Sequence, residues 1–426
     1  MPKLHELLCT FDTNPDSGPR KRKRSAFSLD GRKKVRKVRE SGACVSCRLR
    51  KISCSENGIC GHCNKAANNP QLAKQICLRN KLKDTYVGVK EIFGKLDERR
   101  AVLDPILQSL TGSSVPILLS VGPFGAGRAA LPLNVMRCNA SPVCRWKGLG
   151  KINGIFLTCD SVYDERYVVD PSTLPSVDEI DRFGRNILSI SRGSHSGEIT
   201  RLLDDFLLSY CSLGSSSPLR QFSDSTLKIA GLNNIVCYGY LHLRDGSFDL
   251  LNRPSTENAF DTSYISPTVH EQIRLLAAEG LERVEESVFS EIDAFNKLIG
   301  ANKHARIVGG ICLLRLLLLY RDRVFRDRIR LHLPTQKLRH RTRLEQWTFM
   351  YKRLSIAYGA LCRDSNSPIT TKWVAEEGPE NHELKLQFQR LRSPYLDLCN
   401  EKLTQDHDDV FKSLVTRGKE TTPKKP

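Results

Sequence analysis

Six cysteines between residues 44 and 77 are the side chains of this sequence best suited to metal chemistry. They form two C-x2-C pairs and two single positions, separated by 2, 6, 5, 2 and 13 residues: Cys44, Cys47, Cys54, Cys60, Cys63 and Cys77. Cysteine thiolates at such spacings are typical zinc ligands, and each tetrahedral zinc ion takes four ligands. Six thiolates therefore satisfy two zinc ions if two of the sulfurs bind both metals.

A smaller site also fits the spacing. The two pairs alone form a C-x2-C-x12-C-x2-C pattern, so a single structural zinc ion on these four thiolates would leave Cys54 and Cys77 without a role. Disulfides are a less favoured use of the six thiols. The first ten residues lack the apolar core and the cleavage pattern of a secretory signal, so we expect the cysteines to be reduced.

Positive charge is concentrated around the cysteines. The chain of 426 residues has a net charge of +19, and residues 20–83 hold 19 Lys or Arg against 3 Asp or Glu. A segment this basic attracts polyanions such as nucleic acids. Two dense runs precede the cysteines and predict a nuclear-import signal read by import receptors: Arg20, Lys21, Arg22, Lys23 and Arg24, then Arg32, Lys33, Lys34, Arg36, Lys37 and Arg39.

The segment between the second and third cysteines reads Cys47-Arg48-Leu49-Arg50-Lys51-Ile52-Ser53-Cys54. With the cysteine spacing it resembles the fungal binuclear zinc-cluster (Zn(2)-C(6) fungal-type) transcription factors, which place Arg directly after the second cysteine and Lys three residues further on. The last gap corresponds to the long-last-loop variant, and Ile59 stands where the family often has proline, so Gly58 would supply the turn. The resemblance implies two zinc ions: Cys44 and Cys60 would bridge them, Cys47 and Cys54 would complete one site, and Cys63 and Cys77 the other.

The resemblance also implies a function in the nucleus. Residues 48–51 would form the short helix that enters the major groove of DNA. There Lys51, with Arg50, would donate to guanine O6 and N7, while Arg48 would contact phosphate. The partner would be double-stranded DNA with G·C-rich triplet half-sites, and the sequence leaves open a homodimer that reads two of them. We therefore predict a sequence-specific, zinc-dependent transcription factor of RNA polymerase II genes, and no enzyme.

Composition divides the chain into five parts. We predict a disordered basic tail at 1–40, the binuclear zinc-cluster domain at 41–83, a linker with a short helix at 84–114, a mainly helical regulatory or interaction domain at 115–416 and a frayed tail at 417–426. The fold class is thus a small zinc-stapled module with short helices, followed by a mainly α domain with a few strands around 115–170.

Apolar patterns place elements in the larger domain. Short apolar runs beside Gly and Pro predict strands at Val115–Val121 and Gly154–Thr158. Spacings of three and four predict helices at 268–300, 305–331, 340–362 and 380–417, the first of them capped by Thr268 and Glu271. The longest apolar run, Ile307–Tyr320, contains Arg315 and is too short for a membrane span, so it predicts a buried helix.

Three other interpretations apply to parts of the sequence. A second basic stretch, Arg321–Arg343, is typical of the solvent-facing side of packed helices, and the acidic helix at 268–300 is a suitable partner for it. A second nucleic-acid-binding patch is the alternative for this stretch. The chain could also be a zinc-stabilised adaptor that binds protein or RNA and whose basic tail binds polyanions without sequence specificity. A catalytic site in 115–426 is a further alternative, although no catalytic motif marks one.

Overall fold

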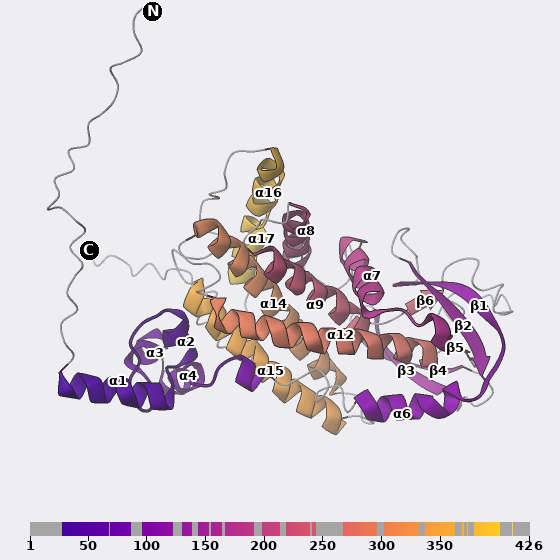
Figure 1. Cartoon of the computed structure of the whole chain (residues 1–426), viewed down its shortest axis with the longest axis horizontal. Helices are drawn as coiled ribbons and strands as arrows, with labels where there is room; N and C mark the ends of the chain where they lie inside the picture. Colours follow the sequence, from indigo (N-terminus) through magenta and orange to yellow (C-terminus); the bar gives the residue numbers. More distant parts are fainter. Residues whose placement is uncertain are drawn as a thin grey trace, which may run out of the picture.

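The computed structural model describes residues 28–67, 69–86, 96–121, 130–138, 144–152, 155–163, 167–190, 198–213, 219–238, 241–243, 267–295, 302–331, 337–362, 369, 373, 379–400 and 411. The chain is mainly helical, with a cysteine-rich module near its N-terminus and antiparallel strands at the far end of the long helices (Figure 1). Within these residues, no helix is long and apolar enough to cross a membrane.

Short helices build the cysteine module. They are α1 (Leu29–Ser41), α2 (Val45–Leu49), α3 (Gly61–Ala66) and α4 (Pro70–Ile76), followed by the 3-10 turn η1 (Lys83–Thr85). Helices of five to seven residues such as α2, α3 and α4 are too short to be stable in isolation, so their stability must come from tertiary contacts.

For residues 29–40, helix α1 corrects the prediction of a disordered tail at 1–40; residues 1–27 lie outside the described residues. The Ser28 hydroxyl caps this helix by accepting a hydrogen bond from the Gly31 N–H at 3.0 Å, and Arg36 pairs with Glu40 one turn later at 2.9 Å. Local capping and an i,i+4 ion pair therefore favour a helix in a segment judged only by its polarity. The first basic run, Arg20–Arg24, lies outside the described residues.

The strands form two antiparallel sheets. One has the order β5-β2-β1-β6, with β1 (Leu110–Val121), β2 (Leu131–Cys138), β5 (Tyr167–Val169) and β6 (Leu241–Leu243). The other pairs β3 (Cys144–Ile152) with β4 (Ile155–Tyr163). Both predicted strands are confirmed over their described residues; Gly154 lies outside them. The predicted linker holds a helix, α6 (Leu96–Leu107), but its last residues already belong to β1, where Gly112 has a φ of +83° at a break in register.

Eight helices of the described chain form the larger core: α7 (Val177–Ile190), α8 (Glu198–Ser212), α9 (Arg220–Tyr238), α12 (Pro267–Asp293), α14 (Lys303–Arg330), α15 (Lys337–Leu361), α16 (Pro379–Arg390) and α17 (Arg392–Asn400). Helix α14 runs through their centre, packed against α8, α9 and α15. All of Ile307–Tyr320 is buried, as predicted. The buried Arg315 guanidinium pairs with Asp204 of α8 at 2.6 Å, which makes its position in an apolar helix tolerable.

Two predicted helix boundaries are wrong. Helix α12 begins at Pro267, so Thr268 lies inside the helix and does not cap it. Proline is favoured at the first helical position because its φ is preset and its missing N–H needs no partner. The predicted helix at 380–417 is interrupted at Leu391, between α16 and α17.

The basic stretch Arg321–Arg343 is only partly the solvent-facing surface that the sequence predicts. Arg323 is 2% exposed and pairs with Glu285 of α12 at 2.8 Å, so the acidic partner is confirmed while the exposure is not. Arg343 and His340 are also buried and both bind the Asp327 carboxylate. Although burial opposes ionisation, hydrogen bonds from these two side chains lower the pKa of Asp327 to about 2.

Helices α7 and α9 cross with their backbones in contact. A Cβ atom added at Gly184 would lie 2.7 Å from the carbonyl carbon of Gly231, and one added at Gly231 would lie 2.8 Å from that of Gly184.

We expect Gly184→Ala to lower the free energy of unfolding by about 1–3 kcal/mol, because the backbone atoms that the new methyl group meets cannot move away as a flexible side chain can. Urea unfolding, monitored by circular dichroism, measures this free energy. Arg182→Ala, on the exposed side of α7, should stay within about 0.5 kcal/mol; equal midpoints for the two variants would contradict the close crossing.

Candidate metal centre

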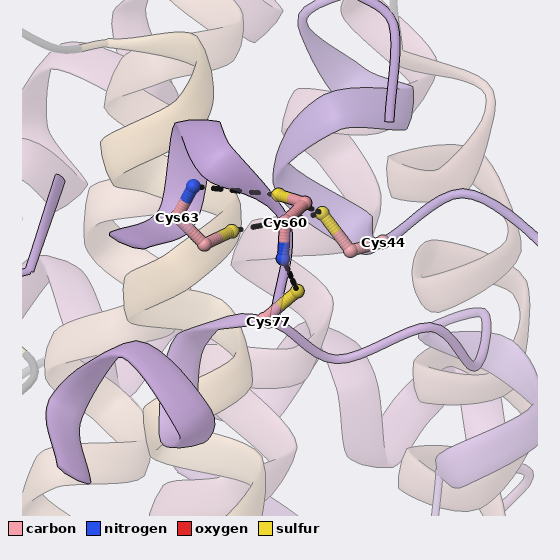
Figure 2. A group of neighbouring side chains, drawn as sticks. All are labelled: Cys44, Cys60, Cys63 and Cys77. Atoms are coloured by element: carbon pink, nitrogen blue, oxygen red, sulfur yellow. Dashed lines mark hydrogen bonds between the residues drawn. The ribbon is translucent and has the colours of Figure 1, made fainter. Parts of the chain in front are cut away.

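The six cysteine sulfurs form two groups of four that share two members. One group contains Cys44, Cys60, Cys63 and Cys77, and the other contains Cys44, Cys47, Cys54 and Cys60; within each, all sulfurs lie within 4.8 Å of one another. Figure 2 shows the sulfurs of the first group turned toward one another. The structure thus brings together all six predicted ligands, and the shared pair is the one that the resemblance implies as bridges.

The distances between sulfurs fit metal coordination. Cys44 Sγ lies 3.8 Å from Cys60 Sγ and 3.7 Å from Cys63 Sγ, and Cys47 Sγ lies 3.6 Å from Cys60 Sγ. Sulfurs bound about 2.3 Å from one tetrahedral ion lie about 3.8 Å apart, whereas a disulfide joins sulfurs about 2 Å apart. Neither group is the four-cysteine set of the single-zinc alternative, because one needs Cys54 and the other needs Cys77.

Two short helices position the shared sulfurs in the same way. Cys44 and Cys60 are the N-cap residues of α2 and α3, with extended backbone conformations. Each Sγ accepts a hydrogen bond from the backbone N–H three residues further on, at 3.4 Å from Cys47 and 3.3 Å from Cys63. A C-x2-C pair at a helix start therefore places both sulfurs on the first turn. Cys77, at the end of α4, accepts from the Cys60 N–H at 3.3 Å.

The electrostatics of the six thiols favour a cation among them. Hydrogen bonds from the Cys63 thiol and the Cys47 N–H lower the pKa of Cys44 to about 4. Burial raises the pKa of Cys47 and Cys54, and it raises that of Cys77 to about 11. Several neighbouring thiolates are unfavourable without a counter-charge, and a bound metal ion would supply it. The cysteines are thus positioned to hold metal, and metal uptake would release protons.

Arg79 is a structural residue of the centre that the sequence analysis missed. Its Nη1 donates to the Gly42 carbonyl at 2.6 Å, and its Nη2 donates to the Ser55 and Gly58 carbonyls at 3.0 and 3.3 Å. One guanidinium therefore ties the segment before α2 to the loop before α3. Gly42 and Gly58 have φ values of +75° and +63°, so Gly58 makes the predicted turn. Nothing in the cysteine spacing indicates Arg79.

The three predicted DNA-binding residues have different environments. The predicted helix at 48–51 is wrong, because α2 ends at Leu49, and Arg50 and Lys51 are exposed directly after it. Lys51 has a φ of +52°, and its N–H and that of Ile52 close the end of the helix onto Arg48 and Cys47. Glycine usually takes such a position, so Lys51 carries backbone strain. Arg48 instead pairs with Asp293 of α12 at 2.6 Å; its contact with phosphate stays a prediction.

Helix α1 carries the second basic run beside the cysteine loops. Its cations are exposed: Arg32, Lys33, Lys34, Arg36, Lys37 and Arg39. Lys37 pairs with Glu56 at 3.3 Å, and the Ser41 hydroxyl donates to the Glu56 carbonyl at 3.0 Å. These contacts hold a cationic helix against the loop that follows Cys54. His62 is exposed on α3 and belongs to neither sulfur group.

Comparisons with known proteins do not assign this chain to a family. No protein-family model matches it, and neither the curated proteins nor the solved structures include a match. The functional argument therefore depends on the residues and their geometry.

The shared sulfurs predict unequal effects of single cysteine substitutions. Cys44→Ser removes a ligand from both groups and should abolish most metal binding, whereas Cys77→Ser removes a ligand from one group and should leave about one ion per chain. Elemental analysis of the full-length protein purified with Zn²⁺ measures the number of zinc ions per chain. Cys211→Ser, outside both groups, should bind as the unchanged chain does; equal losses from the Cys44 and Cys77 variants would argue against sharing.

The Arg79 contacts predict that its guanidinium is required for metal retention. Arg79→Lys keeps the charge but cannot donate to three carbonyls from one rigid fork, so the module should lose about 2 kcal/mol of stability. Faster release of metal to a colorimetric chelator is the expected result. The matched control is Arg50→Lys, which changes an exposed guanidinium. Identical release rates for the two variants would assign Arg79 no structural role.

Proposed function

We propose that this chain is a zinc-dependent, sequence-specific DNA-binding transcription factor that acts in the nucleus. One observation carries the proposal: two four-sulfur groups share Cys44 and Cys60, and exposed Arg50 and Lys51 directly follow the helix between the shared sulfurs. The proposal includes two zinc ions, because all the candidate ligands are thiolates and zinc is commonly bound by four cysteine sulfurs in a tetrahedral arrangement.

The zinc ions would determine whether the module folds. Between Cys44 and Leu82 the buried side chains are few, and four of them are the cysteines themselves: Cys44, Val45, Cys47, Leu49, Cys60, Cys63, Leu72, Ala73, Ile76 and Leu82. So small a core contributes little stability, and metal–thiolate bonds replace it in many small domains. Six thiolates around two dications would then hold α2 and its basic residues in a fixed orientation.

The exposed cations support binding to double-stranded DNA. Long donors at the end of a rigid short helix suit the guanine edge in the major groove, and the cations of α1 suit the phosphate backbone. Lys51 adds a specific argument. A backbone strain that glycine would relieve is retained at an exposed lysine, as expected where the side chain itself has a function.

The remaining parts of the chain have supporting roles in this proposal. The two basic runs would be recognised by nuclear import receptors, and the long helices would bind regulatory partners. No catalytic activity is assigned to the chain. A homodimer reading two G·C-rich triplets stays compatible with it. The rival function is a zinc-stabilised adaptor for protein or RNA, which would use the same cations without reading bases.

Lys51→Gly separates folding from base recognition. Glycine at this left-handed position should keep the module folded and stabilise it by about 1 kcal/mol. If Lys51 contacts a base, the variant should lose about 1–3 kcal/mol of discrimination at one base pair. Duplexes selected by the full-length protein from a randomised pool, followed by competition binding at constant salt, provide the measurement.

The control is Lys65→Ala, which removes an exposed lysine from α3. It should weaken binding to all duplexes by the same small factor, because a phosphate contact carries no sequence information. If Lys51→Gly behaves in this way too, Lys51 meets phosphate only and the adaptor gains support. If the unchanged, zinc-loaded chain selects no sequence at all, the proposed function is wrong.

A further inference from the structure

The cysteine module packs on the long helices through the helix that is proposed to read DNA. Helix α2 lies against α15, and η1 lies against α12. Figure 1 shows the module beside one end of these long helices. The contact is unusual for a DNA-reading surface, because part of α2 is covered by the same chain.

Asp293, the last residue of α12, is the centre of this contact. Its Oδ1 accepts a hydrogen bond from Arg48 Nη2 at 2.6 Å, and its Oδ2 accepts one from the Lys83 backbone N–H at 3.0 Å. The Arg48 side chain is 27% exposed and that of Asp293 is 13% exposed. An ion pair that is largely removed from water is stronger and less screened than a surface pair.

Further contacts extend the same surface. Lys83 Nζ lies 3.9 Å from Glu286, and Lys352 of α15 donates to Gln75 of α4 at 3.2 Å. The Tyr86 hydroxyl donates to Glu285 at 2.8 Å. These contacts bring the basic module against carboxylates of α12.

Tyr86 connects the contact to the core of the long helices. Its ring stacks on Phe289 with centroids 5.0 Å apart. Its acceptor, Glu285, is fully buried and also pairs with Arg323 at 2.8 Å. The chain that leaves the module is therefore anchored at a buried ion pair, which keeps the module close to α12 when other contacts open.

We infer that this docked arrangement is an autoinhibited state, in which Asp293 binds the Arg48 guanidinium that would otherwise contact a DNA phosphate. The inference rests on the proposed function. Asp293 accepts from Arg48 Nη2 at 2.6 Å, Nη1 donates to the Arg79 carbonyl at 3.5 Å, and Nε is buried. A phosphate oxygen would therefore have to replace the carboxylate on this guanidinium. DNA binding then has to displace α2 from α15 and Arg48 from Asp293.

The charges around Asp293 make the docked state sensitive to a single carboxylate. Arg353 of α15 is 4% exposed, and its Nε and Nη1 have no hydrogen-bond acceptor within the described residues. Burial lowers the pKa of Arg353, Asp293 raises it and Arg48 lowers it, and together they bring it to about 10. One carboxylate thus lies among two guanidiniums, and without its charge these two cations would repel each other across the contact.

Asp293→Asn tests the inference in the full-length, zinc-loaded chain. Asparagine keeps an oxygen for the Lys83 N–H but removes the charge that holds Arg48. The variant should bind the selected duplex about fivefold more tightly or better, the lower end of typical coupling between two sites. Asp178→Asn is the matched control, because it removes an equal charge from a side chain that is 84% exposed on α7. It should bind as the unchanged chain does.

Amide hydrogen exchange supplies a second measurement on the unchanged chain. Addition of the selected duplex should speed exchange at the end of α12 and at the Lys83 N–H, because the contact between them opens, while Tyr86 stays anchored to Glu285. Unchanged exchange there with DNA bound would overturn autoinhibition, as would equal affinity of Asp293→Asn and the unchanged chain; in both cases the proposed function survives. If neither the unchanged chain nor the Asp293→Asn variant selects any duplex, the proposed function and this inference fail together.

Discussion

The sharing of Cys44 and Cys60 between two four-sulfur groups is the constraint on which the N-terminal module depends. Each shared sulfur caps a helix, and each helix is too short to be stable alone. The backbone N–H groups that fix the sulfurs are the first donors of those same helices, so cluster geometry and local structure stabilise each other. A change at either shared position would therefore disturb both helices at once.

Arg79 complements the cluster from outside. The thiolates can hold the starts of α2 and α3, but they do not control the loops between them. The Arg79 guanidinium donates to carbonyls of both loops and so replaces contacts that a hydrophobic core would make in a larger domain. The module thus has two centres of organisation, one formed by sulfur and one by a cation.

The larger helical part uses charge differently. Two of its buried ion pairs, Arg315 with Asp204 and Arg323 with Glu285, lie in contacts between helices where most of the buried side chains are apolar. Such pairs add little net stability over apolar side chains, but removal of one partner leaves a buried charge and is costly. Each pair links two helices that are distant in the sequence, α8 with α14 and α12 with α14. Through Tyr86, the same network reaches the chain that leaves the module, so core packing and the position of the module are linked.

The sequence by itself determined the candidate metal ligands, the clustering of charge near them and the main helices. Cysteine spacing and apolar periodicity are local properties, so Ile307–Tyr320 could be recognised as buried and the six cysteines as one site. Local signals also indicated α1, namely the Ser28 cap and the Arg36–Glu40 pair, but the polar composition of the segment favoured a prediction of disorder. Only the tertiary structure decided the role of Arg79 and the partner of Arg48. Asp293 lies 245 residues from Arg48 along the chain, and no local pattern can indicate a contact that the packing of α12 against the module creates.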